Sequence, residues 1–395
     1  MSYRGEGLIS IASGVSIMKQ CSLMTSQKLD LTKSVAKLDE LASVLRGAGR
    51  RRVLLLCHNN PDPDSIASAF GLSFLLSKRF GVRSVLGYGG VVTRAENKAM
   101  IQRLRIKLQQ FSRIEPSKFY AIALIDAQPG TGNSLMGQRD EPPVIVIDHH
   151  PLRRLSQRSD FHDVRPHYGA TSTIITEYLV ASELTPTRSL ANALLYGIKT
   201  DTNTLGRGAT KTDFNAFLYL SSYANPRVVG RIENPPLPRE FFEDYVKGLS
   251  STLIFRDAAV SSLGKIRSSS IIPELADLLL RVHGVSWSFC MGENKNLLIL
   301  SLRSTSHTYR AGVVLRKVLG KAGSAGGHKE MAGGQFPLSG LTRTEKDDLR
   351  TNLISKFLKL IDREHCTGKL MVESNESQCM KKGGLANTAP PSKRQ

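Results

Sequence analysis

The stretch VLLLCHNNPDPD, from Val53 to Asp64, decides the fold that this sequence predicts. A run of apolar residues leads directly into one histidine and two aspartates, His58, Asp62 and Asp64. Two later apolar runs end in the same way: FYAIALID closes on Asp126, and VIVIDHH closes on Asp148, His149 and His150. In an open α/β sheet, ligands bind outside the carboxyl ends of the strands. We therefore expect these acids and imidazoles to meet at one sheet edge and to form a metal site.

Predicted strands and helices alternate around this stretch. We expect strands over 53–58, 83–87, 119–126 and 144–148, and helices over 65–78, 95–110, 171–182, 188–199 and 212–223. This alternation is typical of an α/β fold with a doubly wound, mainly parallel sheet. The proline-rich stretch IENPPLPRE (232–240) and the pattern after it predict a second, smaller α/β domain with a glycine-rich loop over 323–334.

The length of 395 residues suits two domains. We expect a leader at 1–25 without regular structure, a first domain at 26–238 that opens with a helix, a linker helix at 239–254, a second domain at 255–365 and a disordered tail at 366–395. The chain has no apolar run of the roughly 18 residues that a membrane helix needs. Five cysteines without a CxxC pair favour a cytoplasmic protein over a disulfide framework.

The net charge of +20 is strongly basic. A surface of this charge attracts polyanions, although basic composition can also serve solubility alone. We favour an anionic partner, a short single-stranded nucleic acid or a nucleotide, and we expect no membrane partner. The charge therefore narrows the substrate class without naming the substrate.

The strand-end residues offer carboxylates and imidazoles but no thiolates. Such ligands suit Mn²⁺, Mg²⁺ or Co²⁺ better than a structural zinc ion. One ion could take His58 and Asp62 and a second could take Asp64, with Asp126 as a bridge between them. His149 could complete the second ion, with Asp201 from LLYGIKTD as a terminal ligand. Asp148, which directly precedes His149, is expected to orient that ring. Two cations about 3.5–4 Å apart clamp the attacking and leaving oxygens of a phosphoryl displacement and activate a water.

Five motifs carry a resemblance to a known family. HNNPDPDSIASA, ALIDAQP, VIVIDHHP and GIKTDTNTLGRGATKTD resemble, in order, the four motifs of the DHH phosphoesterase superfamily. AGGHKEMAGG resembles the Gly-Gly-His motif of the associated C-terminal domain, DHHA1. The resemblance is greatest to oligoribonuclease and pAp phosphatase types and less to RecJ. It implies a Mn²⁺ enzyme with six ligands, bridged by Asp126 and assisted at the scissile phosphate by His150: His58, Asp62, Asp64, Asp126, His149 and Asp201.

The second domain is expected to hold the substrate across a cleft. Arg303 follows the strand LLILSL, and its planar guanidinium suits bidentate phosphate binding. Arg310 opens the next expected helix. A turn that contains Gly326, Gly327 and His328 can present backbone N–H groups to an anion. The resemblance places these residues on the substrate-binding face.

The main hypothesis is a two-metal hydrolase that degrades short oligonucleotides, linear dinucleotides and pAp to mononucleotides. An inorganic pyrophosphatase or polyphosphatase is the alternative enzyme, but SLRSTSHTYR and the glycine-rich stretch favour nucleotides. A non-catalytic nucleotide-binding sensor is the alternative from another class, and the complete set of six ligands argues against it. The choice among RNA, single-stranded DNA, dinucleotide and pAp, the polarity of degradation and the formation of a homodimer stay open at the level of sequence.

Overall fold

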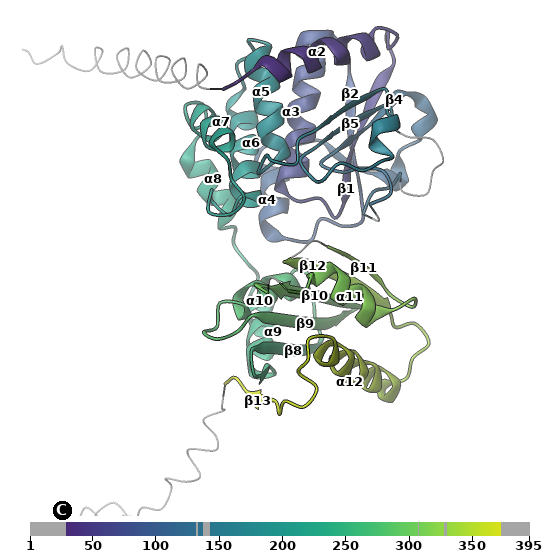
Figure 1. Ribbon diagram of the computed structural model, residues 1–395, viewed down its shortest axis with the longest axis vertical. Helices are drawn as coiled ribbons and strands as arrows, with labels where there is room; N and C mark the ends of the chain where they lie inside the picture. Colours follow the sequence, from purple (N-terminus) through teal and green to yellow (C-terminus); the bar gives the residue numbers. More distant parts are fainter. Residues whose placement is uncertain (1–28, 132, 137–142, 307, 328–329, 373–395) are drawn as a thin grey trace, which may run out of the picture. The chain divides into compact units, whose positions relative to one another are not determined.

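The computed structural model describes residues 29–131, 133–136, 143–306, 308–327 and 330–372 (Figure 1). The chain divides into two compact units, Met1–Pro236 and Leu237–Gln395. The expected leader at 1–25, most of the expected tail at 366–395, and His328 lie outside the described residues. In the part of the chain that is described, no helix has the length and apolar character needed to span a membrane.

A six-stranded sheet forms the centre of the first unit (Figure 1). Its spatial order is β3-β2-β1-β4-β5-β6, and every neighbouring pair is parallel. The strands are β1 (Arg52–Asn59), β2 (Ser84–Gly89), β3 (Leu108–Gln110), β4 (Phe119–Ile125), β5 (Ile145–Asp148) and β6 (Phe161–Val164). The strand order changes direction between β1 and β4, and the crevice at such a switch point is where open α/β sheets bind ligands.

Strand β1 is apolar along its length because both faces of the sheet are covered. Val53 and Leu55 point into one core, and Leu54 and Leu56 point into another, as the two-residue period of a strand requires. Helices α2 (Thr32–Leu45), α3 (Pro63–Phe80), α5 (Thr171–Ala181) and α6 (Arg188–Asp201) contribute to the first core. Side chains from the segment 111–136 pack in the second. Helices α4 (Ala95–Arg103), α7 (Lys211–Ser221) and α8 (Pro226–Glu233) complete the unit.

Two parts of the first unit differ from the expectation. The helix expected over 95–110 is wrong beyond Arg103, because Arg105 has a left-handed φ of 56° that ends the helix before β3 begins. Strand β6 and helix α8 were not anticipated. Strand β6 has only four residues, and its buried Asp163 is compensated by the guanidinium of Arg165.

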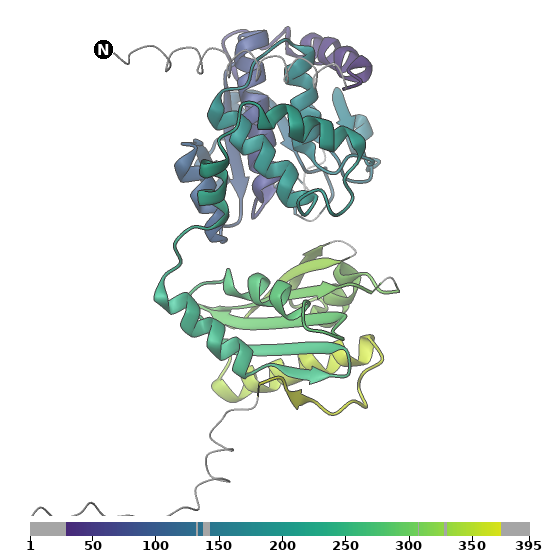
Figure 2. The same cartoon turned by 90° about the vertical axis from the view of Figure 1, so that its left-hand side faces the viewer.

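The second unit is built on a mixed seven-stranded sheet, which Figure 2 shows in side view. The order is β11-β12-β10-β9-β8-β7-β13, and only β8 and β9 run parallel among neighbouring strands of the described residues. The strands are β7 (Leu253–Phe255), β8 (Ala258–Lys265), β9 (Trp287–Asn294), β10 (Leu297–Ser304), β11 (Ser324–Gly327), β12 (Met331–Pro337) and β13 (Lys369–Leu370). Helices α11 (Ala311–Leu319) and α12 (Arg343–Leu360) pack on one face, and α9 (Arg239–Ser250) and α10 (Ile271–Leu279) pack on the other.

The glycine-rich loop expected over 323–334 is wrong, because most of this segment forms two paired strands, β11 and β12. Gly326 lies opposite Gly333, and Gly327 lies opposite Ala332. A Cβ atom on Gly327 would lie 2.3 Å from the carbonyl oxygen of Met331, so the close backbone approach requires glycine. The helix expected to link the domains is α9, which lies in the second unit and packs Phe241 into its core.

Candidate metal centre

Three neighbouring strands deliver the polar residues to the carboxyl edge of the first sheet. His58 is the penultimate residue of β1, Asp126 directly follows β4, and Asp148 ends β5. Asp126 has a φ of 56°, a left-handed conformation that costs a residue other than glycine about 1–3 kcal/mol. The backbone N–H of Asp126 donates to Ile147 at 2.9 Å. The surrounding sheet therefore holds this carboxylate in an unusual backbone conformation.

The first group of candidate ligands is His58, Asp62 and Asp126. The Nε2 atom of His58 lies 3.4 Å from the carboxylate of Asp62 and 3.7 Å from that of Asp126. Asp62 is also the N-cap of α3, where it accepts a hydrogen bond from the Ser65 N–H at 3.0 Å. The Nδ1 atom of His58 lies 2.9 Å from the carbonyl oxygen of Asn59, which fixes the proton on Nδ1. Nε2 then faces the two carboxylates.

The second group is Asp64, His149 and Asp201. The Nε2 atom of His149 is buried and lies 3.2 Å from the Asp201 carboxylate, without a hydrogen bond of ordinary geometry. Its Nδ1 atom lies 3.1 Å from the carbonyl oxygen of Tyr168. A ring nitrogen held by a carbonyl, with the other nitrogen turned toward acids, is the usual arrangement of a metal-binding histidine.

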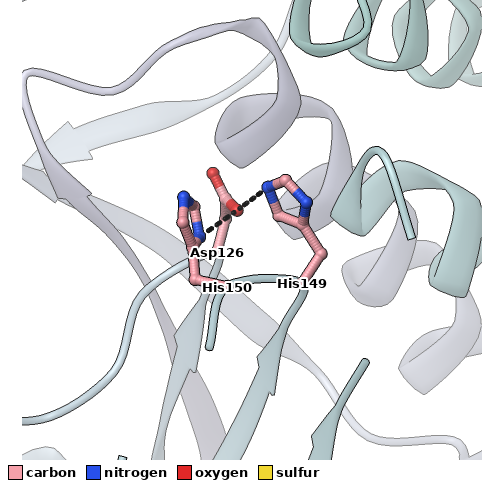
Figure 3. A group of neighbouring side chains, drawn as sticks. All are labelled: Asp126, His149 and His150. Carbon is pink, nitrogen blue, oxygen red and sulfur yellow. Dashed lines mark ion pairs between the residues drawn. The ribbon is translucent and has the colours of Figure 1, made fainter. Parts of the chain in front are cut away.

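Asp126 lies between the two groups. Its carboxylate is 3.6 Å from His149 Nε2 and 3.7 Å from His150 Nδ1, and both approaches are drawn in Figure 3. Together with its approach to His58, this places Asp126 within reach of both groups. The Thr171 hydroxyl donates to the same carboxylate at 2.9 Å. Asp126 therefore occupies the position that a bridging ligand would need.

The expectation that Asp148 orients the ring of His149 is wrong. Asp148 accepts a hydrogen bond from His150 Nδ1 at 2.9 Å and one from the backbone N–H of His149 at 2.8 Å. The ring of His149 is held instead by the carbonyl oxygen of Tyr168. The rings of His149 and His150 are inclined by 58° to each other. Each ring therefore has a different hydrogen-bond partner. Asp148 thus supports His150.

The N-terminus of α5 holds a fully buried acid of the site. Asp64 is fully buried and accepts from the backbone N–H groups of Thr171 at 2.7 Å and Ser172 at 2.8 Å. The positive end of a helix stabilises a carboxylate there. Asp213 in turn holds the start of this helix, because it accepts from the Gly169 N–H at 2.9 Å and from the Thr173 hydroxyl at 2.6 Å.

The carboxylates of the site repel one another. Burial and the charge of Asp201 raise the pKa of Asp64 to about 7. Burial and Asp64 raise the pKa of Asp126 well above its ordinary value, and burial and Asp62 raise that of Asp201. Asp62 is the exception, because His58 lowers its pKa despite the opposing effect of burial. A site with this much unbalanced negative charge favours cations.

The two histidines respond to the same charge. Burial lowers the pKa of His58, but Asp62 outweighs this and raises it to about 9. Burial also lowers the pKa of His149, but Asp201 raises it to about 10. Without metal, protons on these rings supply part of the positive charge that balances the carboxylates. The donor set, two imidazole nitrogens and four carboxylates, fits hard divalent cations.

The residues expected to hold substrate lie in the second unit. Arg303 is only 6% exposed, and its guanidinium binds Asp277 on α10 and the Ser301 hydroxyl, the latter at 2.8 Å. The guanidinium is thus buried against a half-exposed carboxylate, with Asp277 already in the place of an anion. Arg310 is exposed at the N-cap of α11, and Gly326 is exposed on the edge strand β11.

One supporting residue was missed from the sequence. Gln128 is 1% exposed and its Nε2 donates to Asp148 at 2.6 Å. It lies two residues after the strand-end Asp126 in the quoted ALIDAQP stretch, where a buried amide gives no pattern of its own. The sequence signal that could have indicated Gln128 is its position just after a predicted strand end.

A parallel sheet with two groups of acid and imidazole ligands at its switch point defines a metal-dependent hydrolase of the α/β class. Family models match both units: the DHH family, N-terminal domain, matches residues 52–198, and the DHHA1 domain matches residues 256–363. The chain belongs to the DHH/DHHA1 phosphoesterase superfamily. Members are metal-dependent phosphoesterases, so the chain is a hydrolase that acts on phosphate esters.

Two curated proteins and a solved structure are similar to this chain. "Uncharacterized protein MJ1633" of Methanocaldococcus jannaschii is 35% identical over 347 residues, which cover 82% of this chain and 70% of the relative. "Uncharacterized protein MJ0988" of the same organism is 27% identical over 178 residues, 43% of this chain and 51% of the relative. An exopolyphosphatase-related protein from Bacteroides fragilis has a similar fold, with a TM-score of 0.63 at 16% identity, over 82% of this chain and 98% of that chain.

Proposed function

We propose that this chain hydrolyses short oligonucleotides, linear dinucleotides or pAp to mononucleotides with two bound Mn²⁺ ions. Three overlapping groups of three residues at this sheet edge could hold metal among the described residues. The observation that carries the proposal is that two of these groups together use six different residues, with Asp126 within reach of both. His58, Asp62 and Asp126 would hold one ion. Asp64, His149 and Asp201 would hold the other, and Asp126 would bridge. Two divalent ions at such a site neutralise the phosphate and activate a water.

The protein itself prepares the site before substrate arrives. The carbonyl oxygens of Asn59 and Tyr168 fix the protons of His58 and His149 on Nδ1 and leave each Nε2 for a ligand. The N–H groups at the start of α5 hold Asp64 in place. Such preorganisation avoids rearrangement during the reaction.

His150 is proposed to assist the reaction rather than to bind metal. Burial raises the pKa of Asp148, but its hydrogen bond from His150 outweighs this and holds the pKa below the ordinary value. The ionised Asp148 keeps a proton on His150 Nδ1. Nε2 of His150 is then the atom that would stabilise the transition state or donate a proton to the leaving oxygen.

A nucleotide polyanion fits the charge of the chain, which is +20. In the second unit, the exposed Arg310 and the strand-edge Gly326 and Gly327 are proposed substrate contacts. Arg303 is left out of this set because its guanidinium is buried against Asp277.

The test is hydrolysis by the full-length protein in Mn²⁺. The substrates are labelled di- to pentanucleotides, pAp and pyrophosphate. Release of mononucleotide from the oligonucleotides, or of phosphate from pAp, supports the proposal. Asp126→Asn should abolish this activity, and Asp39→Asn on the exposed face of α2 should retain it. Phosphate release from pyrophosphate alone would favour a pyrophosphatase, and nucleotide binding without any turnover would favour a sensor.

A further inference from the structure

An exposed basic segment directly follows the site histidines. Residues 151–155, PLRRL, are all exposed and lead into a short 3₁₀ turn, η3 (Ser156–Arg158). They place two adjacent arginines, Arg153 and Arg154, three and four residues after His150. Among the described residues, neither guanidinium takes part in a hydrogen bond or an ion pair.

The segment is exposed but firmly attached. The Oε1 atom of Gln128 accepts from the Arg153 N–H at 2.7 Å and from the Ser156 hydroxyl at 2.8 Å. The Nε2 atom of the same amide donates to Asp148 at 2.6 Å and to the Pro151 carbonyl at 3.2 Å. One buried side chain therefore ties both ends of the segment to the carboxylate that holds His150.

The short chain between His150 and the arginines limits how far from the site histidines the two guanidinium groups can bind. A chain spans at most about 3.6 Å per residue, so the Cα atoms of Arg153 and Arg154 lie within about 11 and 14 Å of that of His150. The planar guanidinium group matches the geometry of a phosphate and can bind it bidentately. No Asp or Glu lies within residues 149–159, so no acid of this stretch competes with a phosphate for the pair.

We propose that residues 151–155 form a phosphate-binding segment of the first unit, in which Arg153 and Arg154 bind phosphates of the substrate beside the one that is hydrolysed. Gln128 is a positioning residue that keeps the segment in register with His150. This inference rests on the proposed function, because it takes the bound phosphates to be those of the substrate. The binding itself is tested separately from turnover.

The experiment measures binding of a fluorescein-labelled single-stranded pentanucleotide by anisotropy over a series of salt concentrations. The parent is the full chain with Asp126→Ala, which prevents hydrolysis. Each phosphate contact contributes about 0.7 to the slope of log K against log salt for single strands. Arg153→Ala/Arg154→Ala should therefore reduce the slope by about 1.4. Gln128→Ala should also weaken binding, although it removes no charge.

The matched control is Lys78→Ala/Arg79→Ala, which removes the same charge from exposed positions at the far end of α3. These positions lie roughly 20 Å along the helix from its start near the site. A slope that falls equally in the control and in the arginine variant would overturn the proposal, and so would a parent that does not bind. Wild-type protein that fails to hydrolyse any nucleotide, while the arginine variant alone loses slope, would reject the proposed function and leave the binding segment standing.

Discussion

Replacement of Arg165 by leucine should unfold the first unit at much lower denaturant concentration. Arg165 is fully buried between two acids: it binds Asp163 through Nε and Nη2, the latter at 2.6 Å, and Glu177 through Nη1 at 2.5 Å. Its Nη2 also donates to the Ser34 hydroxyl on α2 at 3.0 Å. Arg165→Leu leaves the buried carboxylate of Glu177 without a counter-charge and leaves Asp163 with only the half-exposed Lys33. Breaking a buried ion pair in this way costs about 3–5 kcal/mol.

The neighbouring Lys33 provides a matched control on the same carboxylate. Its ammonium group lies 3.5 Å from Asp163, but the side chain is 51% exposed. Exposed pairs contribute about 0–1 kcal/mol, so Lys33→Met should cost less than about 1 kcal/mol. A loss of about 1 kcal/mol or less for Arg165→Leu, equal to the control, would refute the argument from burial.

Urea unfolding can follow the two units separately. The chain has one tryptophan, Trp287 on β9 of the second unit. Its fluorescence should report an unchanged transition in Arg165→Leu, whereas far-ultraviolet circular dichroism should show the early loss of the first unit. A shift of the Trp287 transition by the same amount would show that the effect is not confined to the first unit.

The pH dependence of the first transition follows from Asp163. Burial raises the pKa of Asp163, but its hydrogen bonds with Arg165 outweigh this and lower it. A carboxyl group with a lowered folded-state pKa stabilises the fold above its unfolded pKa of about 3.9, and this contribution is lost as the pH falls through the folded value. The wild-type transition should therefore weaken below about pH 4. The deficit of Arg165→Leu should shrink with acid, because protonation neutralises the carboxylates left behind.

Three further changes have defined outcomes. Gly197→Ala should cost about 1–3 kcal/mol and weaken Mn²⁺ binding, because its Cβ would lie 2.4 Å from Ser172 Oγ and 3.1 Å from the Cα of Asp64; urea unfolding and metal titration check this. Mn²⁺ at a hundred times its Kd should stabilise the first unit by about 2.7 kcal/mol, and Asp201→Asn should reduce that gain; thermal unfolding with and without chelator measures it. Thr342→Ala should cost the second unit about 1 kcal/mol through loss of the capping box of α12, read from tryptophan fluorescence.

Three strands of the first sheet could be predicted because each is a nearly continuous apolar run. Strands β1, β4 and β5 are buried on both faces, and each ends where polar residues begin. Strand β3 has three residues, the central residues of β6 (FHDV) are polar, and half of β11 (SAGG) is glycine. Such strands are stabilised by pairing with their neighbours, which a local pattern does not contain.

The candidate ligands were predictable for the same reason, since parallel strands bring their carboxyl ends to one edge. The directions of their side chains were not. Asp148 precedes His149 in sequence yet binds the ring of His150, because the chain turns at the strand end. Arg303 alternates with Leu302 along β10 and faces α10, and one strand does not reveal that a helix covers that face. Gln128 forms hydrogen bonds with residues 20 and 28 positions later in the chain, and such distant partners leave no local sequence pattern.

Charge balance predicts two metal ions at the candidate site. The two ligand groups contain four carboxylates, Asp62, Asp64, Asp126 and Asp201, and two imidazoles that are neutral when they bind metal. Asp148 is excluded because it belongs to neither ligand group and accepts hydrogen bonds from His150 and Gln128. Four buried negative charges are costly unless they are paired, and two divalent cations balance them, whereas one leaves a charge of −2. We therefore expect calorimetric titration to give two Mn²⁺ per chain, with release of protons from His58 and His149, whose pKa values of about 9 and 10 keep them protonated without metal. One ion per chain, or binding without proton release at neutral pH, would contradict this account of the site.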